Sequence, residues 1–214
     1  HLDYDNRDLL RAWEQLTLSR PERTASGRFD CVNIPRQCLE NYFGSLNGRC
    51  IAAYRSGDRE AVARLSARLL ELLDDIDRLV AADTYFLLGK WISDARSMGT
   101  TPAERDYFER DARNILTTWG GRGYSLNDYA NRTWSGLVSD YYKERWQRFY
   151  DRLQSGGELD EEALLQELQD FEWEWVGRKE RFAVKPRGDA FRLCRSLYTK
   201  YAAAIDRFYT EKTE

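Results

Sequence analysis

The residues of this chain that could do chemistry gather at one turn, residues 119–124 (WGGRGY), and in the stretch after it. The C–H face of a pyranose packs on an indole or phenol ring, while nearby amide, carboxylate and guanidinium groups bond its hydroxyls. Such a set is present here: Trp119, Arg122, Tyr124, Asn127, Asp128 and Tyr129. The turn is therefore either a well-packed corner between two helices, which the residues alone favour, or a sugar- or ligand-binding surface.

The sequence predicts no catalytic centre, no metal site and no cofactor. The motifs of zinc proteases, P-loop proteins, serine hydrolases and dinucleotide-binding folds are absent, and His1 is the sole histidine, so no histidine-based triad can form. The cysteines show no metal-ligand spacing and are expected to be buried thiols; they are Cys31, Cys38, Cys50 and Cys194. On its own residues, the chain is not predicted to be an enzyme.

Composition is typical of a folded globular protein: of 214 residues, 42% are hydrophobic and 32% are charged. A formal net charge of −3 gives no general attraction for nucleic acid. No apolar stretch approaches the roughly 20 residues that span a bilayer. The polar N-terminus starts at His1 without a methionine, so we expect a trimmed piece of a longer polypeptide with no signal peptide of its own.

Apolar residues recur at spacings of three and four along nearly the whole chain, which predicts helices and no sheet. The expected helices are about 6–19, about 33–55 (after a polar linker at 23–28, with Pro35 in the first turn), one from Asp58 through Leu79, one between Thr84 and Gly99, one between Thr101 and Trp119, one from Asp128 to about Gln154, one capped by Asp160, and one after Asp189. Thr101 and Glu104 have the spacing of a capping box, with Pro102 between them.

The connections between these helices are short, so sequential neighbours should pack antiparallel. We predict one all-α domain over residues 1–214, a bundle of about seven to eight helices. Within it, the helix from Asp58 repeats its apolar residues with a seven-residue period between Val62 and Leu79. That period is also typical of a dimerising coiled coil, but it covers only about three heptads, which favours a member of an intramolecular bundle.

Several stretches carry a resemblance that is far more specific than any short motif. They are residues 114–120 (NILTTWG), 128–142 (DYANRTWSGLVSDYY) with Arg145 and Trp146, 86–92 (FLLGKWI), 186–189 (PRGD) and 30–42, which contains Arg36 and Gln37. Together they resemble the C-terminal helical domain of the α-N-acetylglucosaminidases, glycoside hydrolase family 89. One departure is Pro35, which stands where the family usually has threonine. The likeness covers essentially the whole chain.

The resemblance implies a definite function. Enzymes of this family carry a small N-terminal domain, a catalytic (β/α)8 barrel and this helical domain, which packs on the barrel and helps wall the substrate pocket. They release terminal α-linked N-acetylglucosamine from glycans with retention, through two glutamates on the barrel, one nucleophile and one acid/base. Retaining enzymes hold those carboxyl groups about 5–5.5 Å apart. Both glutamates would lie N-terminal to His1, so this chain is expected to be inactive alone.

By the same resemblance, Trp119, Leu126 and Tyr129 are expected on or just behind the pocket wall, where they would contact the sugar without taking part in the chemistry. The implied partners are the barrel of the same polypeptide and a glycan ending in α-linked N-acetylglucosamine, and family members act on secreted, periplasmic or lysosomal glycans. The competing hypothesis is an independent helical module that binds carbohydrate or protein, or serves as a scaffold. In that case the same aromatics are core residues or dock a protein.

Overall fold

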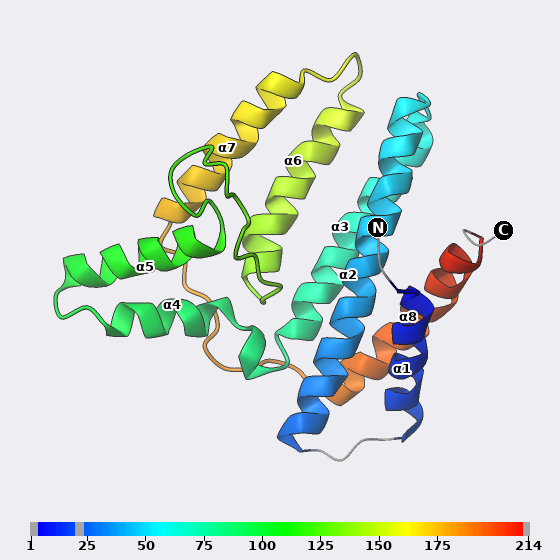
Figure 1. The fold of residues 1–214 in the computed structure, drawn as a ribbon, viewed down its shortest axis with the longest axis horizontal. Helices are drawn as coiled ribbons and strands as arrows, with labels where there is room; N and C mark the ends of the chain where they lie inside the picture. The colour runs from blue at the N-terminus through cyan, green and yellow to red at the C-terminus, as the bar shows by residue number, and fades with distance from the viewer. Residues whose placement is uncertain (1–3, 20–23, 212–214) are drawn as a thin grey trace. The chain divides into compact units, whose positions relative to one another are not determined.

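The computed structural model describes residues 4–19 and 24–211, and within them the chain forms eight α-helices (Figure 1). They are α1 (Asn6–Ser19), α2 (Ala25–Arg55), α3 (Arg59–Val80), α4 (Leu88–Ser97), α5 (Pro102–Leu116), α6 (Lys143–Gln154), α7 (Glu161–Gly177) and α8 (Ala190–Thr210). A short 3-10 helix, Thr84–Phe86, precedes α4, and a π-helix, Val138–Tyr142, precedes α6. In this part of the chain the only β pairing is an isolated bridge between Leu87 and Ser135. The all-α prediction is confirmed.

Polar residues predicted to begin helices do so through their side chains. Asp58, Asp160 and Asp189 each accept a hydrogen bond from the backbone N–H three residues later. Thr101 and Glu104 form the predicted capping box, in which each side chain binds the backbone of the other. These starts were predictable because both partners of each bond are close in sequence.

The predicted start of the second helix is wrong. The helix begins at Ala25, eight residues before the expected start, and Thr24 is its N-cap, with Oγ1 accepting from the Gly27 N–H at 3.1 Å. The supposed polar linker is therefore largely the first helical turn. Pro35 lies inside the helix and is buried, so the packing of this face tolerates a residue that lacks a backbone donor.

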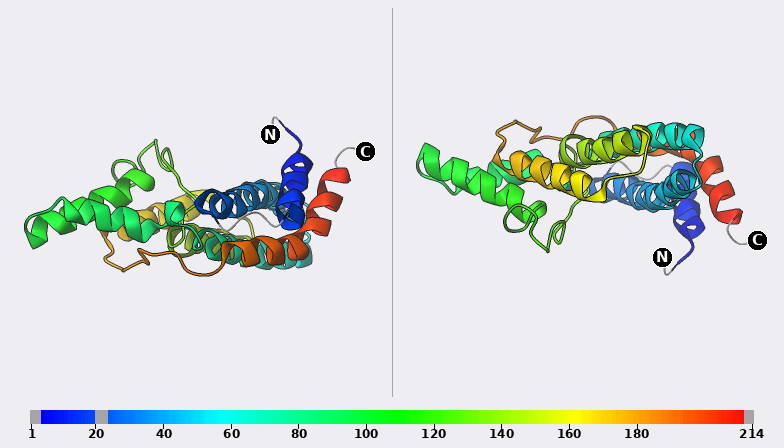
Figure 2. Two further views of the ribbon diagram at one scale, coloured as in Figure 1. Left: turned by 90° about the horizontal axis from the view of Figure 1, so that it is seen from below. Right: turned by 90° about the horizontal axis from the view of Figure 1, so that it is seen from above.

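The described chain divides into two compact units, and the first comprises the described residues up to Tyr85 and those from Pro186 onward. In this unit α2 and α3 run side by side in all views (Figures 1 and 2), and α1 and α8 pack together. Trp13 is fully buried, and its indole N–H donates to the carbonyl of Cys194 at 3.0 Å. All four cysteines are buried. The seven-residue seam of α3 faces into this unit, as the bundle interpretation predicted.

The second unit, residues 86–185, contains α4 to α7 around an aromatic core. Its buried members are Leu88, Ile92, Leu116, Leu137, Tyr141, Phe171 and Trp175. Here the bridge joins two stretches that the resemblance singled out: the Leu88 N–H donates to the Ser135 carbonyl at 3.1 Å, and the Ser135 N–H donates to the Phe86 carbonyl at 2.8 Å.

The segment between α7 and α8 passes directly over Gly89. A Cβ at this position would lie 2.3 Å from the carbonyl oxygen of Ala183 and 2.6 Å from that of Phe182. At Gly136, where φ is 91°, a Cβ would meet the Phe182 ring at 2.7 Å. Both glycines are therefore required by close approach of the same segment.

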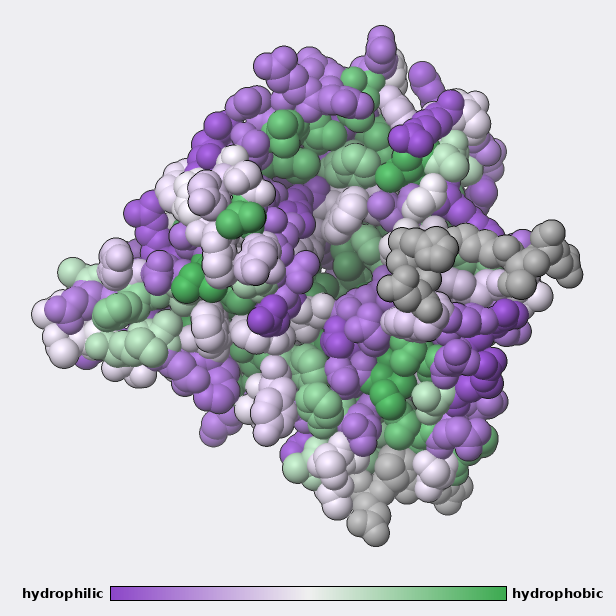
Figure 3. All heavy atoms as spheres, in the orientation of Figure 1, coloured by the Kyte–Doolittle hydropathy of each residue, from purple (hydrophilic) through white to green (hydrophobic). Residues whose placement is uncertain are grey.

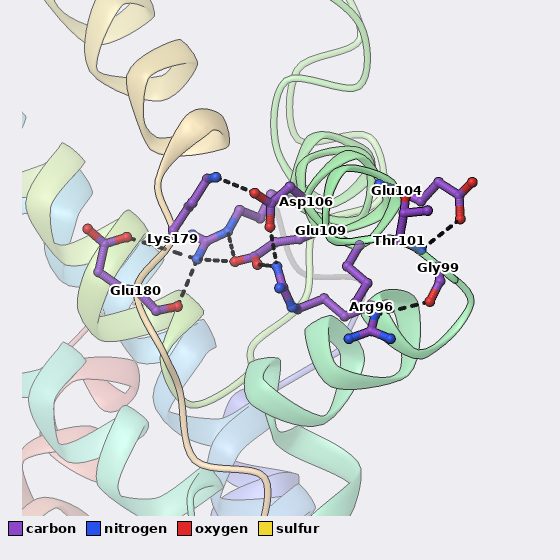
Figure 4. A network of polar contacts seen from close by, with 10 residues as sticks. Arg96, Gly99, Thr101, Glu104, Asp106, Glu109, Lys179 and Glu180 are labelled. Atoms are coloured by element: carbon purple, nitrogen blue, oxygen red, sulfur yellow. Dashed lines mark hydrogen bonds and ion pairs between the residues drawn. The ribbon is translucent and has the colours of Figure 1, made fainter.

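A network of charges joins α4, α5 and the segment after α7 (Figure 4). Arg96 binds Asp106 at 2.9 Å and Glu109 at 2.6 Å, and Lys179 binds the other oxygen of Asp106. Arg113 is fully buried; it binds Glu109 at 3.1 Å and donates to the Glu180 carbonyl at 3.0 Å. Each buried charge thus has a partner of opposite sign. In the described residues no helix is long and apolar enough to cross a membrane.

We predict that Gly89→Ala destabilises the chain by about 1–3 kcal/mol, because the new Cβ collides with backbone that cannot move aside without disturbing the second unit. Gly44→Ala is the matched control. Gly44 is also helical, and its Cβ would meet nothing within 4 Å, so this substitution should stabilise α2 by up to about 1 kcal/mol. Urea unfolding measures both. Equal stability of the two variants would contradict the close approach at Gly89.

Candidate functional site

The predicted binding residues lie in a closed loop that follows α5. The Asp128 N–H donates to the Thr117 carbonyl at 2.7 Å, which brings the two ends of the loop together. The Gly120 N–H donates to the Thr118 carbonyl at 2.7 Å across Trp119, whose φ is 59°. A hydrogen bond between residues two apart, around a centre of positive φ, is a rare and strained γ-turn. Among the described residues other than glycine, only Trp119 and Asp128 have a positive φ, and that of Asp128 is 60°.

The structure brings Trp119, Leu126 and Tyr129 together in this loop. The rings of Trp119 and Tyr129 are in contact, with centroids 5.0 Å apart and planes inclined by 58°. The Tyr129 N–H donates to the Leu126 carbonyl at 3.0 Å. Tyr129 is 70% exposed and Leu126 41%, whereas Trp119 is half-buried. The three residues therefore present an aromatic and aliphatic surface to solvent.

Neighbouring loop residues extend this surface. Tyr124 is 48% exposed, and its ring lies so close to Gly120 that a Cβ there would meet it at 2.8 Å. Arg122 binds Asp170, and its second nitrogen donates to Gln166 at 2.6 Å, which fastens the loop to α7. In the space-filling view the loop, left of centre, shows pale side chains of intermediate hydropathy around a small green patch (Figure 3).

The prediction of a helix from Asp128 to about Gln154 is wrong at its start. Residues 125–134 form turns and extended chain, and helical structure begins only near Leu137. Asn127 and Asp128 are residue types that commonly cap helices. Instead the positive φ of Asp128 turns the chain away from a helix, and both side chains bind residues far along the sequence.

Those partners form a charge cluster centred on Arg145 of α6, in which Glu172 is buried and the other members are half-buried. Its guanidinium binds the Asp128 carboxylate at 2.7 Å and the Glu172 carboxylate of α7 at 2.9 Å. The second oxygen of Glu172 accepts from the Asn127 side-chain amide at 2.7 Å. The guanidinium also lies over the rings of Tyr141 and Tyr142, at 5.1 and 5.4 Å. We call Arg145, Asp128, Glu172 and Asn127 the Arg145 cluster.

Burial governs the electrostatics of this cluster. It raises the pKa of the Glu172 carboxyl, and the nearby Arg145 charge opposes that rise. Burial also works against the charge of Arg145, but Tyr141 and Asp128 more than offset it, so the pKa of the guanidinium is raised. Both carboxylates share one cation, which suits them to holding structure rather than to transferring protons.

Sequence reasoning found the exposed aromatics but missed the Arg145 cluster. Arg145 was noted only as part of a motif, and Glu172 was not noted at all. One signal was available: Arg145 follows Tyr141 by one helical turn, on a face that the aromatics mark as buried. Within the described residues no three histidine, cysteine or acidic side chains converge as metal ligands do.

Comparison with known proteins agrees with the resemblance. The sequence model of a family described as the C-terminal domain of α-N-acetylglucosaminidase (NAGLU) matches residues 1–200. The human α-N-acetylglucosaminidase is 32% identical over 205 residues, which covers 92% of this chain and 28% of the human protein.

Solved structures of a family 89 glycoside hydrolase from Clostridium perfringens are similar in fold. A complex with 2-acetamido-1,2-dideoxynojirmycin has a TM-score of 0.84 at 28% identity, covering 94% of this chain and 24% of that one. A variant with two glutamates replaced by glutamine, in complex with its substrate GlcNAc-α-1,4-galactose, has a TM-score of 0.87 at 27% identity, covering 97% and 25%. This chain spans about a quarter of the length of these relatives. It belongs to the family of C-terminal domains of α-N-acetylglucosaminidases, in glycoside hydrolase family 89.

Proposed function

We propose that this chain is the C-terminal helical domain of an enzyme that releases terminal α-linked N-acetylglucosamine from glycans. The domain packs on a catalytic barrel, and its loop of Trp119, Leu126 and Tyr129 forms part of the wall of the sugar pocket. The observation that carries the proposal is the exposure of this aromatic loop, held closed at both ends, in a chain whose relatives include a hydrolase bound to a sugar.

The loop contributes contacts rather than chemistry. Tyr129 offers an exposed ring face and a phenolic hydroxyl, which suit the C–H face and a hydroxyl of a pyranose. Leu126 adds apolar surface beside it. The Trp119 ring packs against the Tyr129 ring, with centroids 5.0 Å apart, and so supports it. None of the three side chains carries a carboxyl group, which most glycoside hydrolases use as acid, base and nucleophile.

The reaction itself is assigned to the barrel. The bacterial relative bound to its intact substrate carries two glutamate-to-glutamine substitutions, which is consistent with two glutamates being essential in that protein. In this protein the corresponding carboxyl groups would precede His1. Carboxylates of the Arg145 cluster are poor substitutes, because both are neutralised by the same guanidinium.

We predict that the isolated chain folds but releases no chromophore from an aryl α-N-acetylglucosaminide. The reason is that the carboxylates beside the loop in the described part of the chain, Asp128 and Glu172, are both bound to Arg145 and so are poorly suited to act as acid and nucleophile. Far-UV circular dichroism establishes helical folding, and a colorimetric assay measures release. Steady hydrolysis that disappears when one carboxylate of this chain is replaced by its amide would contradict the proposal.

We predict that Tyr129→Phe, made in the full-length enzyme, lowers kcat/KM by an amount equivalent to about 1–3 kcal/mol of lost hydrogen bonding. Stability should stay unchanged, because Tyr129 is 70% exposed. Trp119→Ala should lower both quantities, with a stability loss smaller than the about 3–5 kcal/mol of a fully buried tryptophan.

The comparison of melting temperature with kcat/KM separates the two roles. If Tyr129→Phe leaves kcat/KM unchanged, or destabilises the enzyme as much as Trp119→Ala, Tyr129 does not face the sugar. The pocket wall would then be formed by other residues of the loop, of which Leu126 and Tyr124 are the exposed candidates.

A further inference from the structure

We propose that Arg145 and Glu172 are positioning residues: through Asp128 and Asn127 they hold the loop of Tyr129 in the conformation that binds the sugar. This inference rests on the proposed function of that loop. Neither Arg145 nor Glu172 is expected to touch the sugar, and both act through the two loop residues that directly precede Tyr129.

The backbone of Asp128 is held in a strained conformation. Its φ of 60° is unfavourable for a residue with a side chain, and it sets the direction in which the chain enters Tyr129. Two interactions hold it there. The Asp128 N–H binds the Thr117 carbonyl at 2.7 Å, and its carboxylate binds Arg145 at 2.7 Å. Strain of this kind persists only where the surroundings fix it, and it is enriched at binding sites.

The hydrogen bonds and ion pairs of the cluster link α6 and α7 to the loop. Glu172 uses one oxygen for Arg145 and the other for Asn127, and its side chain is 5% exposed. Arg145 is 18% exposed and spans from α7 to the loop. A loop in any other position would leave Arg145 with one carboxylate partner in place of two, and one oxygen of Glu172 without the Asn127 amide.

Contacts outside this cluster also hold α6 and α7 together. The ring of Tyr141, in the π-helix that leads into α6, stacks on Phe171 of α7 with centroids 5.8 Å apart. Farther along, Arg152 of α6 binds Glu167 of α7 at 2.6 Å. The Arg145 cluster attaches residues 127 and 128 to this helix pair. We therefore expect its loss to alter the loop more than the packing of the two helices.

The test uses the full-length enzyme with three variants of the cluster and one control. Arg145→Lys keeps the charge but cannot bridge two carboxylates as a planar guanidinium does. Glu172→Gln keeps the shape and an oxygen for Asn127. Asp128→Gly removes the attachment while accepting the positive φ, so it separates positioning from stability. Arg152→Gln breaks a different arginine–carboxylate link between α6 and α7, away from the loop, where Arg148 also contacts Glu167.

We expect Arg145→Lys and Asp128→Gly to lower kcat/KM about ten- to a hundredfold, mainly through KM, because the sugar contacts are misplaced rather than removed. Glu172→Gln should have a smaller effect in the same direction. Hydrogen exchange should speed up at the amides of residues 119–129, Asp128 above all, while α6 and α7 keep their protection. Arg152→Gln should leave kcat/KM and loop exchange at wild-type values.

Two outcomes would overturn the inference. One is wild-type kcat/KM and wild-type loop exchange in both Arg145→Lys and Asp128→Gly, while Tyr129→Phe is impaired; the proposed function then stands without the positioning role. The other is a loss that follows melting temperature alone and is shared by Arg152→Gln, which would make the cluster merely structural. If Tyr129→Phe has no effect although the loop exchanges faster in Arg145→Lys, the attachment is supported and the proposed function fails.

Discussion

A guanidinium removed from water needs opposite charge beside it, and in this chain that requirement ties a surface loop to a helical core. Arg145 is supplied by α6, Glu172 by α7 and Asp128 by the loop itself. Removing one partner from a buried ion pair typically costs about 3–5 kcal/mol. The pairing is complete only while Asp128 and Asn127 occupy their observed places. The ion pairs of Arg145 thereby hold the exposed aromatic residues in place.

The glycines of the second unit show the same dependence of surface on core. The segment after α7 lacks regular structure, yet it presses its backbone on Gly89 and its Phe182 ring on Gly136. These glycines belong to the stretches 86–92 and 128–142, which carry the family resemblance. The bridge between Leu87 and Ser135 joins the same two stretches. Their sequence is constrained because no side chain fits between them and the segment that crosses over.

From the sequence, local structure was predicted well, but side-chain contacts between residues far apart in the chain were not. Helix starts at Asp58, Thr101, Asp160 and Asp189 were predictable, because each cap and its partner lie within one turn. Asp128 is of a residue type that often caps helices, but its carboxylate binds Arg145, seventeen residues away. Periodicity cannot reveal such a choice. The start of α2 was predicted wrongly for a related reason. Proline favours the first turn of a helix, but Pro35 lies on a buried face in the interior of α2.

For the site, residue types identified the exposed aromatics, but not what holds them. Aromatic side chains beside a glycine-rich turn are visible in any sequence. The family resemblance then led to the choice of the aromatic residues Trp119 and Tyr129 and the aliphatic Leu126 as candidates. Glu172 gave no such sign, because an acidic residue in a helix is usually solvated. Its burial at 4% exposure is set by the tertiary structure alone.

The π-helix at Val138–Tyr142 has a consequence for comparing relatives. Its hydrogen bonds span five residues, as from the Lys143 N–H to the Val138 carbonyl, so this turn accommodates one residue more than an α-helix does. Loss of that residue would leave an ordinary α-turn, whereas loss of a residue between Thr117 and Asp128 would open the loop. Where homologous chains differ in length by one residue in this region, the alignment gap belongs in the helix.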